Sequence, residues 1–183
     1  WYTDWLAVRG VNLFIPHAFY YSITGKRKDE RPPDVGPNSN WWKHYKLWST
    51  YMRRLSCLMT DTTALLPVAV LCRNRALEPD AVRPLYEQQV GFQYLPESVW
   101  KDCRVQDGKL HCRSMEFSAV IDPEQRFPDA PALPKDLSTL ADLQCSPAAP
   151  QLRSAHFLRA GSECWFLVNE GNTDLHTTIT LPT

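Results

Sequence analysis

The amino-acid sequence predicts a mixed α/β chain made of three successive segments. In the first two segments, apolar runs rich in β-favouring residues alternate with amphipathic, helix-like stretches, which is typical of parallel strand–helix units. In the third segment, apolar and polar residues alternate one by one, as they do in half-buried antiparallel strands. These changes of pattern place the segments at residues 1–63, 64–150 and 151–183.

The composition is that of a folded chain without a strong electrostatic field. Hydrophobic residues make up 44% of the 183 residues and include seven Trp, which is enough to build a core. Lys plus Arg and Asp plus Glu number 20 each, so the formal net charge is zero. A neutral chain does not attract nucleic acid or an anionic membrane, and no apolar run approaches the roughly 20 residues of a membrane span. We therefore expect no nucleic-acid partner and no membrane partner.

Residues 1–63 read as a helix end, a strand, a long loop and a long helix. The first helix covers residues 1–8 and stops at Gly10, because glycine favours the backbone conformation that ends helices. The run GVNLFIP at 10–16 predicts a strand buried on both faces. After a charged, proline-rich loop, residues 41–59 predict a helix, because their apolar and aromatic residues recur mostly every three or four positions. Ligands of parallel α/β proteins bind in loops after such strands, so we expect function in this loop.

Residues 64–150 begin with the apolar run ALLPVAVLC, which predicts a buried strand. An amphipathic helix (PDAVRPLYEQQV), a short strand (within GFQYLPESVW), a hairpin that turns at Asp107-Gly108 and a strand at 117–121 are expected to follow. This order predicts a small open α/β domain of flavodoxin-like type. Residues 128–150 are rich in Pro and Ala, so we expect the domain to be reduced and to end in a poorly packed linker. No glycine-rich phosphate loop follows VAVLC, so no nucleotide or flavin cofactor is predicted.

Residues 151–183 predict antiparallel strands. Two strands are expected on either side of a tight turn at Ala160-Gly161, and a third strand within residues 175–181. Alternation predicts one apolar face built from Phe157, Trp165, Leu167, Ile179 and Leu181. We expect this face to be covered by strands beyond residue 183, so the chain alone should self-associate through the face and its open edge. The alternative is that these strands fold back on residues 64–150 and complete a closed unit.

The six cysteines predict no metal site, because none forms a C-x-x-C pair and no His stands at zinc-finger spacing to them. Cys103 and Cys112 flank the predicted hairpin turn, so a disulfide and two separate thiols both fit the sequence. Cys72 stands at a strand end, where amidotransferase-like proteins carry a nucleophile, but no elbow glycine or His partner accompanies it.

Four stretches of the sequence carry a resemblance to known enzymes. RGVNLFIPHAFYYS, followed by KRKDERPPDVGPNSNWWKHYKLWSTYMRRLS and VAVL, resembles the late part of the catalytic barrel in large bacterial glycoside hydrolases. The closest group is the α-L-rhamnosidase-like glycoside hydrolase family 106, with relatives that carry family-2-type sugar-binding domains. LRSAHFLRAGSECWFLVNEGNTDLHTTITLP resembles the opening of a β-sandwich in the same enzymes.

This resemblance implies that the chain is a fragment of such an enzyme. Residues 1–63 would be the terminal βα unit of a (β/α)8 barrel, 64–150 a reduced flavodoxin-like domain and 151–183 the start of an antiparallel β-sandwich. The parent would cleave a terminal sugar, α-L-rhamnose among the candidates, from an oligosaccharide or glycan, and a periplasmic or secreted location would suit it. The alternative is a non-catalytic carbohydrate-binding or assembly module.

Cleavage of a glycosidic bond usually needs two carboxyl groups about 5–10 Å apart. In the resembled enzymes the main carboxylates lie on earlier barrel strands, so we expect them upstream of residue 1 and expect the fragment alone to be inactive. Several of these enzymes hold calcium near the sugar. Here Asp29, Glu30 and Asp34 are too few oxygen ligands to predict an ion, so we predict neither a metal nor another cofactor.

Position and resemblance select five substrate-binding candidates: His17, Tyr20, Tyr21, Glu30 and Trp41. An imidazole can exchange hydrogen bonds with a sugar hydroxyl, although His17 could equally bond a neighbouring backbone group. The aromatic rings suit the apolar C–H faces of sugars. Glu30 could bind sugar hydroxyls or belong to a solvated charge run. Trp42 is instead predicted to lie in the core, on the apolar face of its helix.

Overall fold

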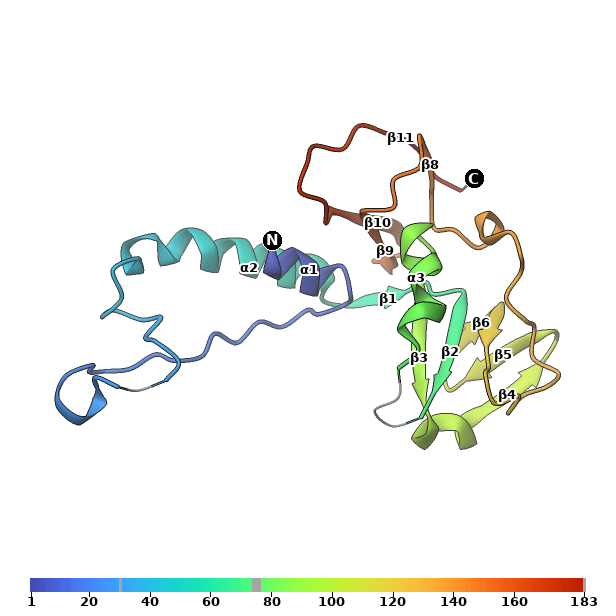
Figure 1. The fold of residues 1–183 in the computed structure, drawn as a ribbon, viewed down its shortest axis with the longest axis horizontal. Helices are drawn as coiled ribbons and strands as arrows, with labels where there is room; N and C mark the ends of the chain where they lie inside the picture. The colour runs from blue at the N-terminus through green and yellow to red at the C-terminus, as the bar shows by residue number, and fades with distance from the viewer. Residues whose placement is uncertain (30, 74–76, 183) are drawn as a thin grey trace. The chain divides into compact units, whose positions relative to one another are not determined.

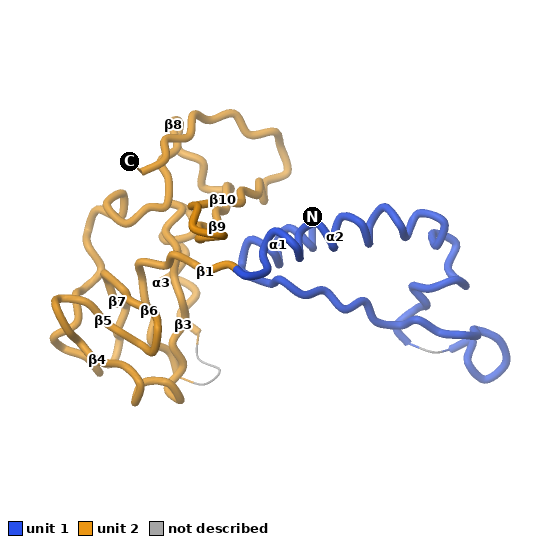
Figure 2. Tube along the Cα trace, turned by 180° about the vertical axis from the view of Figure 1, so that it is seen from behind, with its two compact units in different colours: residues 1–61 blue, residues 62–183 orange. Residues whose placement is uncertain are grey.

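The structure, a computed structural model, describes residues 1–29, 31–73 and 77–182 (Figure 1). The chain divides into two compact units, Trp1–Asp61 and Thr62–Thr183, which Figure 2 shows in different colours. Unit 1 contains helices and a long loop, whereas unit 2 contains every strand of the described residues.

Unit 1 has two α-helices, α1 (Tyr2–Ala7) and α2 (Tyr45–Met59), and the short 3-10 turns η1 (Gly25–Arg27) and η2 (Trp42–His44). Helix α1 ends as predicted, because Gly10 has a φ of 92° and its N–H bonds the carbonyl of Ala7 at 2.9 Å. The two helices are joined by a hydrogen bond from the Tyr51 hydroxyl to the Asp4 carboxylate. The predicted helix over 41–59 is confirmed from Tyr45 onwards.

The strand predicted at 10–16 is absent, and that prediction is wrong. Residues 11–20 form no regular secondary structure, and Leu13 and Ile15 are 68% and 81% exposed. A strand needs a neighbour to bond its backbone N–H and C=O groups, and no strand of unit 1 exists among its described residues. Apolar, β-favouring composition alone therefore leaves this segment as irregular backbone.

The centre of unit 2 is a parallel sheet with the strand order β3-β2-β7. The predicted buried strand is β2 (Val68–Cys72), all of whose residues are buried. Helix α3 (Pro79–Glu87) connects it to β3 (Phe92–Pro96), and β7 (Ala119–Ile121) pairs on the other side of β2. Pro79 takes the first position of α3, where a missing N–H costs nothing.

A hairpin sheet packs on one face of this parallel sheet. It consists of β4 (Cys103–Gln106), β5 (Lys109–Cys112) and β6 (Met115–Phe117), and the 3-10 turn η3 (Glu97–Asp102) precedes it. Ala69 and Leu71 of β2 lie in its cluster, whereas Val68 and Val70 lie in the cluster that includes α3. The side chains of β2 alternate between the two faces of the sheet and thus contribute to two cores. The predicted hairpin and its turn at Asp107-Gly108 are confirmed.

A third sheet has the order β1-β9-β10 and is antiparallel. Its strands are β1 (Thr62–Ala64), β9 (Leu152–Arg159) and β10 (Ser162–Asn169), and the last two are joined by the predicted tight turn. A separate pair is formed by β8 (Gln144–Ser146) and β11 (Thr178–Thr180), and the 3-10 turn η4 (Leu137–Thr139) precedes β8.

The prediction that Phe157, Trp165, Leu167, Ile179 and Leu181 share one apolar face is wrong. Phe157 pairs with Cys164 and His156 pairs with Trp165, so Phe157 and Trp165 lie on opposite faces of the β9–β10 pair. A turn of two residues matches odd positions of one strand with even positions of the other, and both of these residues are odd. Ile179 belongs to the other strand pair and is exposed. Leu181 also lies exposed, at 43%, beyond the end of β11.

The segment 128–150 is better packed than its composition predicts. Leu137, Leu143 and Ala149 are buried, and Leu143 and Ala149 form a cluster with Leu152 and half-buried Trp165. The proline-rich stretch is therefore part of unit 2 rather than a poorly packed linker.

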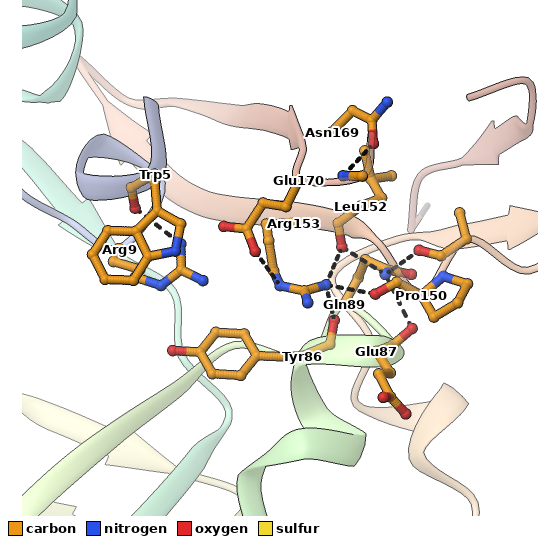
Figure 3. Close-up of polar contacts among 12 residues, drawn as sticks. Trp5, Arg9, Tyr86, Glu87, Gln89, Pro150, Leu152, Arg153, Asn169 and Glu170 are labelled. Atoms are coloured by element: carbon orange, nitrogen blue, oxygen red, sulfur yellow. Dashed lines mark hydrogen bonds and ion pairs between the residues drawn. The ribbon is translucent and has the colours of Figure 1, made fainter. Parts of the chain in front are cut away.

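Two polar side chains hold β9 to the end of α3 (Figure 3). The Nη1 group of Arg153 donates hydrogen bonds to the carbonyls of Tyr86, Pro150 and Leu152, at 3.2, 2.7 and 2.9 Å. The Nε atom of Arg153 lies 3.1 Å from Glu170 Oε2, which forms an ion pair. The buried Gln89 amide donates to the carbonyls of Ala149 and Leu152 at 3.1 and 3.0 Å. These two side chains thus tie backbone carbonyls at the end of α3 to those at the start of β9.

Candidate functional site

The loop predicted to carry function, between α1 and α2, is closed by the carboxylate of Asp34. Its Oδ1 accepts the Tyr20 N–H at 2.8 Å and its Oδ2 accepts the Asn38 N–H at 3.1 Å. Asn38 in turn donates its side-chain amide to the Tyr20 carbonyl at 2.8 Å. The Tyr20 hydroxyl donates to the Pro32 carbonyl, also at 2.8 Å. The loop therefore has a defined shape without regular secondary structure.

These contacts also set the charge state of Asp34. Loss of hydration raises the pKa of this carboxyl group, but the N–H groups of Tyr20, Gly36 and Asn38 together hold the pKa below its usual range. Both oxygens of Asp34 are occupied by backbone donors. Asp34 is thus a structural carboxylate that holds the loop together through both of its oxygens.

The remaining polar candidates are dispersed along the loop. His17 is exposed and makes no hydrogen bond to any described residue. Tyr21 is 88% exposed, and the Arg27 guanidinium lies 5.2 Å from the centre of its ring. Glu30 lies outside the described residues. The structure therefore brings Tyr20 and Asp34 together but leaves His17 and Tyr21 facing solvent.

His17→Ala is expected to leave the melting temperature of the chain almost unchanged, because an exposed side chain without a protein partner contributes at most about 0.5 kcal/mol. Tyr20→Ala is the matched control, since it removes the hydroxyl bond to Pro32 and should lower the melting temperature. Thermal unfolding followed by circular dichroism measures both. A decrease for His17→Ala as large as that of the control would assign His17 a structural role.

Trp41 belongs to a group of five rings at the start of α2, here called the aromatic cluster. Its members are Phe19, Trp41, Trp42, Tyr45 and Trp48. Tyr45 lies at its centre, with ring centroids 5.0 Å from Trp42 and 5.5 Å from both Phe19 and Trp48. The three Trp side chains remain 38–39% exposed. Flat rings that are packed on one side and open on the other suit the apolar face of a sugar.

The prediction of Trp42 as a core residue is wrong. The predicted helix starts before Trp42, but the structure places Trp42 in the 3-10 turn η2, ahead of α2. A 3-10 turn advances about 120° per residue rather than about 100°, so Trp42 leaves the apolar face on which Met52 and Leu55 are buried.

Tyr45 and Trp48 also belong to the aromatic cluster, although their spacing in the sequence predicts only helix packing. The crowding of aromatic residues at 41, 42, 45 and 48 is the signal in the sequence that indicates them.

A second candidate lies at the carboxyl edge of the parallel sheet in unit 2. The chain passes from β2 to β3 on one side, while β7 pairs on the other side, which creates the switch point where α/β sheets bind ligands. A pocket of about 60 Å³ opens there. Its lining residues come from the ends of β2 and β7 and from neighbouring turns: Leu71, Cys72, Arg73, Glu78, Trp100, Asp122, Pro123 and Glu124.

The charged groups of this pocket mostly satisfy one another. Arg73 donates to both carboxylate oxygens of Glu124, at 2.5 and 2.7 Å, which raises the pKa of Arg73 and lowers that of Glu124. Asp122 Oδ2 accepts the Phe127 N–H at 2.7 Å, whereas its Oδ1 is buried without a partner among the described residues. Burial raises the pKa of the Cys72 thiol. A protonated thiol is a weak nucleophile, which counts against the amidotransferase-like comparison.

Among the described residues, no group of three or more His, Cys, Asp or Glu side chains is arranged to hold a metal ion. In the same part of the chain, no helix has the length and apolar character needed to cross a membrane.

No family model, no curated protein and no solved structure significantly matches the chain.

Proposed function

We propose that this chain is part of a glycoside hydrolase and that it supplies sugar-binding aromatic residues, while the catalytic carboxylates belong to another part of a longer protein. The substrate class is a terminal sugar of an oligosaccharide or glycan, with α-L-rhamnose as the first candidate. The single observation that supports this proposal is the aromatic cluster, whose Trp rings are packed against Tyr45 and yet open to solvent.

The chemistry of the cluster fits this substrate class. Sugar rings present C–H groups that stack on indole faces, and a 6-deoxy sugar such as rhamnose adds an apolar methyl group. Because Trp41 contacts both Tyr45 and Trp48, at ring-centroid distances of 6.2 and 6.4 Å, its ring is held in place before a ligand arrives. Such preorganisation lowers the entropy cost of binding.

A non-catalytic carbohydrate-binding module is the second candidate, and the structural role of Asp34 is consistent with it as well. Both oxygens of this carboxylate accept backbone N–H groups of the loop, and these bonds hold its pKa below the usual range, so Asp34 does not suit the role of a general acid. Both candidates use the same rings to bind sugar. They differ in whether a longer protein that contains this chain cleaves the sugar.

Trp41→Ala is expected to weaken sugar binding by about tenfold, because it removes a stacking surface without cutting the loop contacts of Asp34. Binding of L-rhamnose and rhamnose-containing oligosaccharides is followed by the indole N–H signals in NMR titrations. Trp1→Ala is the matched control, since Trp1 is 68% exposed and lies outside the cluster.

Equal affinity in Trp41→Ala and in the wild-type chain would overturn the proposal, as would the absence of binding to every sugar tested.

A second measurement concerns catalysis. The purified chain should release no aryl group from aryl glycosides, and a steady release lost in Asp34→Asn would contradict the placement of the carboxylates elsewhere.

A further inference from the structure

The β4–β5 hairpin brings two cysteines directly opposite each other. Its turn has two residues, Asp107 and Gly108, with φ of 52° and 72°, which is the conformation of a tight hairpin turn. Strand pairing then matches Gln106 with Lys109 and, three pairs further on, Cys103 with Cys112.

The type of this pair matters for its chemistry. In a two-residue hairpin the pair next to the turn exchanges both backbone hydrogen bonds, and the pairs then alternate, so Cys103 and Cys112 form a non-hydrogen-bonded pair. Side chains of such pairs point to the same face with Cα atoms about 4.5 Å apart. Disulfides span Cα distances of about 4.4–6.8 Å, so this position meets the geometric requirement without backbone movement.

The two sulfur atoms also share one neighbour. Both thiols lie within reach of the Val99 carbonyl of η3, at 3.4 Å for Cys103 Sγ and 3.9 Å for Cys112 Sγ. Cys112 is buried in the cluster that contains Trp100 and Leu110, whereas Cys103 is half-buried. The more accessible sulfur therefore belongs to Cys103.

In the structure both cysteines are thiols. Burial, the neighbouring Cys112 thiol and Asp102 raise the pKa of Cys103 to about 12, although Arg113 acts in the opposite direction. The thiolate fraction of Cys103 is therefore small at neutral pH, and its reaction with a disulfide is slow. Cys103 differs in this respect from catalytic cysteines, whose pKa is lowered.

We propose that Cys103 and Cys112 form a cross-strand disulfide by exchange with a low-molecular-weight disulfide such as oxidised glutathione. The Cys103 thiolate attacks the small disulfide and releases one thiol, giving a mixed disulfide. The Cys112 thiolate then attacks Cys103 Sγ and releases the second thiol. One protein S–S bond forms, one small S–S bond is reduced, and the two protein protons end on the two released thiols.

The experiment oxidises the native wild-type chain with oxidised glutathione, blocks remaining thiols and digests with trypsin without reduction. Cleavage after Lys101, Arg104, Lys109 and Arg113 separates the cysteines into different peptides. The expected product joins residues 102–104 to residues 110–113, with a mass about 2 Da below the sum of the two peptides, while 105–109 is released alone.

Oxidation is also expected to raise the melting temperature of unit 2 by about 5–10 °C, because the bond restricts the unfolded chain. Cys103→Ser should abolish this rise, and Cys145→Ser, which changes another half-buried cysteine of the same unit, should keep it. If Cys103→Ser does not fold, the peptide map of the wild-type chain decides alone. Failure of the joined peptide to form in the native chain, its formation only in urea, or pairing of Cys103 with another cysteine overturns the proposal.

Discussion

The stability of unit 2 is expected to fall as the pH rises from 4 to 8, and Asp142→Asn is expected to remove most of this dependence. Asp142 is only 5% exposed, and burial raises its pKa to about 7, against the lowering effect of hydrogen bonds from Ser154 and from the backbone of Gly91. A shift of about three pH units corresponds to about 4 kcal/mol.

The direction of this pH dependence follows from which state of the chain, folded or unfolded, holds the proton of Asp142. The folded chain holds this proton up to about pH 7, whereas the unfolded chain releases it near pH 4, so the stabilisation is complete at low pH and is lost as the pH rises through the folded pKa. An asparagine keeps the hydrogen-bonding shape and has no proton to lose. At pH 8 the variant should therefore be more stable than the wild-type chain.

The neighbours of Asp142 allow one competing outcome, an ion pair between the ionised carboxylate and His156. His156 Nδ1 lies 3.6 Å from Asp142 Oδ1, and its Nε2 lies 3.0 Å from Glu163 Oε2, while its ring stacks on Trp165 at 4.3 Å. Urea unfolding of both chains at pH 5 and pH 8 measures the effect, with exposed Asp107→Asn as the control. A wild-type stability that rises with pH relative to the variant would mean that ionised Asp142 pairs with His156, and would contradict the prediction.

Phe117→Ala is expected to destabilise unit 2 by about 3–5 kcal/mol, because Phe117 is completely buried between the hairpin sheet and the parallel sheet and its truncation leaves a cavity. The central strand β2 should lose protection in the same variant, since Ala69 and Leu71 line the same cluster. Hydrogen exchange of the β2 amides, measured by mass spectrometry, checks both expectations.

Met115→Ala is the control on the same strand. Its side chain is only half-buried at the edge of the cluster, so its truncation should cost about 1–2 kcal/mol. Similar small effects of both variants would mean that the hairpin sheet is not part of the cooperative core of unit 2.

The candidate site could be predicted only in part. The aromatic loop stands out in the sequence, but the sharing of Asp34 between the N–H groups of Tyr20 and Asn38 depends on contacts across 14 and four positions. Spacing does not reveal such contacts, because the loop has no periodicity. The exposure of Trp42 likewise follows from the start of α2 at Tyr45, and helix boundaries are the least certain part of a sequence pattern.

Elements whose stability is local, or whose sequence pattern fits one structure alone, could be predicted from the sequence. The apolar run at Val68–Cys72 is a buried strand, Tyr45–Met59 is a helix, and Asp107-Gly108 turns a hairpin, because length, period and turn chemistry agree at each place.

Which strands and faces find a partner depends on long-range contacts in the folded chain. Residues 10–16 have the composition of a strand, but unit 1 provides no ladder for them among its described residues. Phe157 and Trp165 each alternate correctly on their own strand, and only the register of the β9–β10 pair sends them to opposite faces. Burial of Asp142 follows in the same way from strands and loops far away in the chain. Backbone pairing, register and burial are long-range properties, and local sequence does not encode the neighbour that satisfies them.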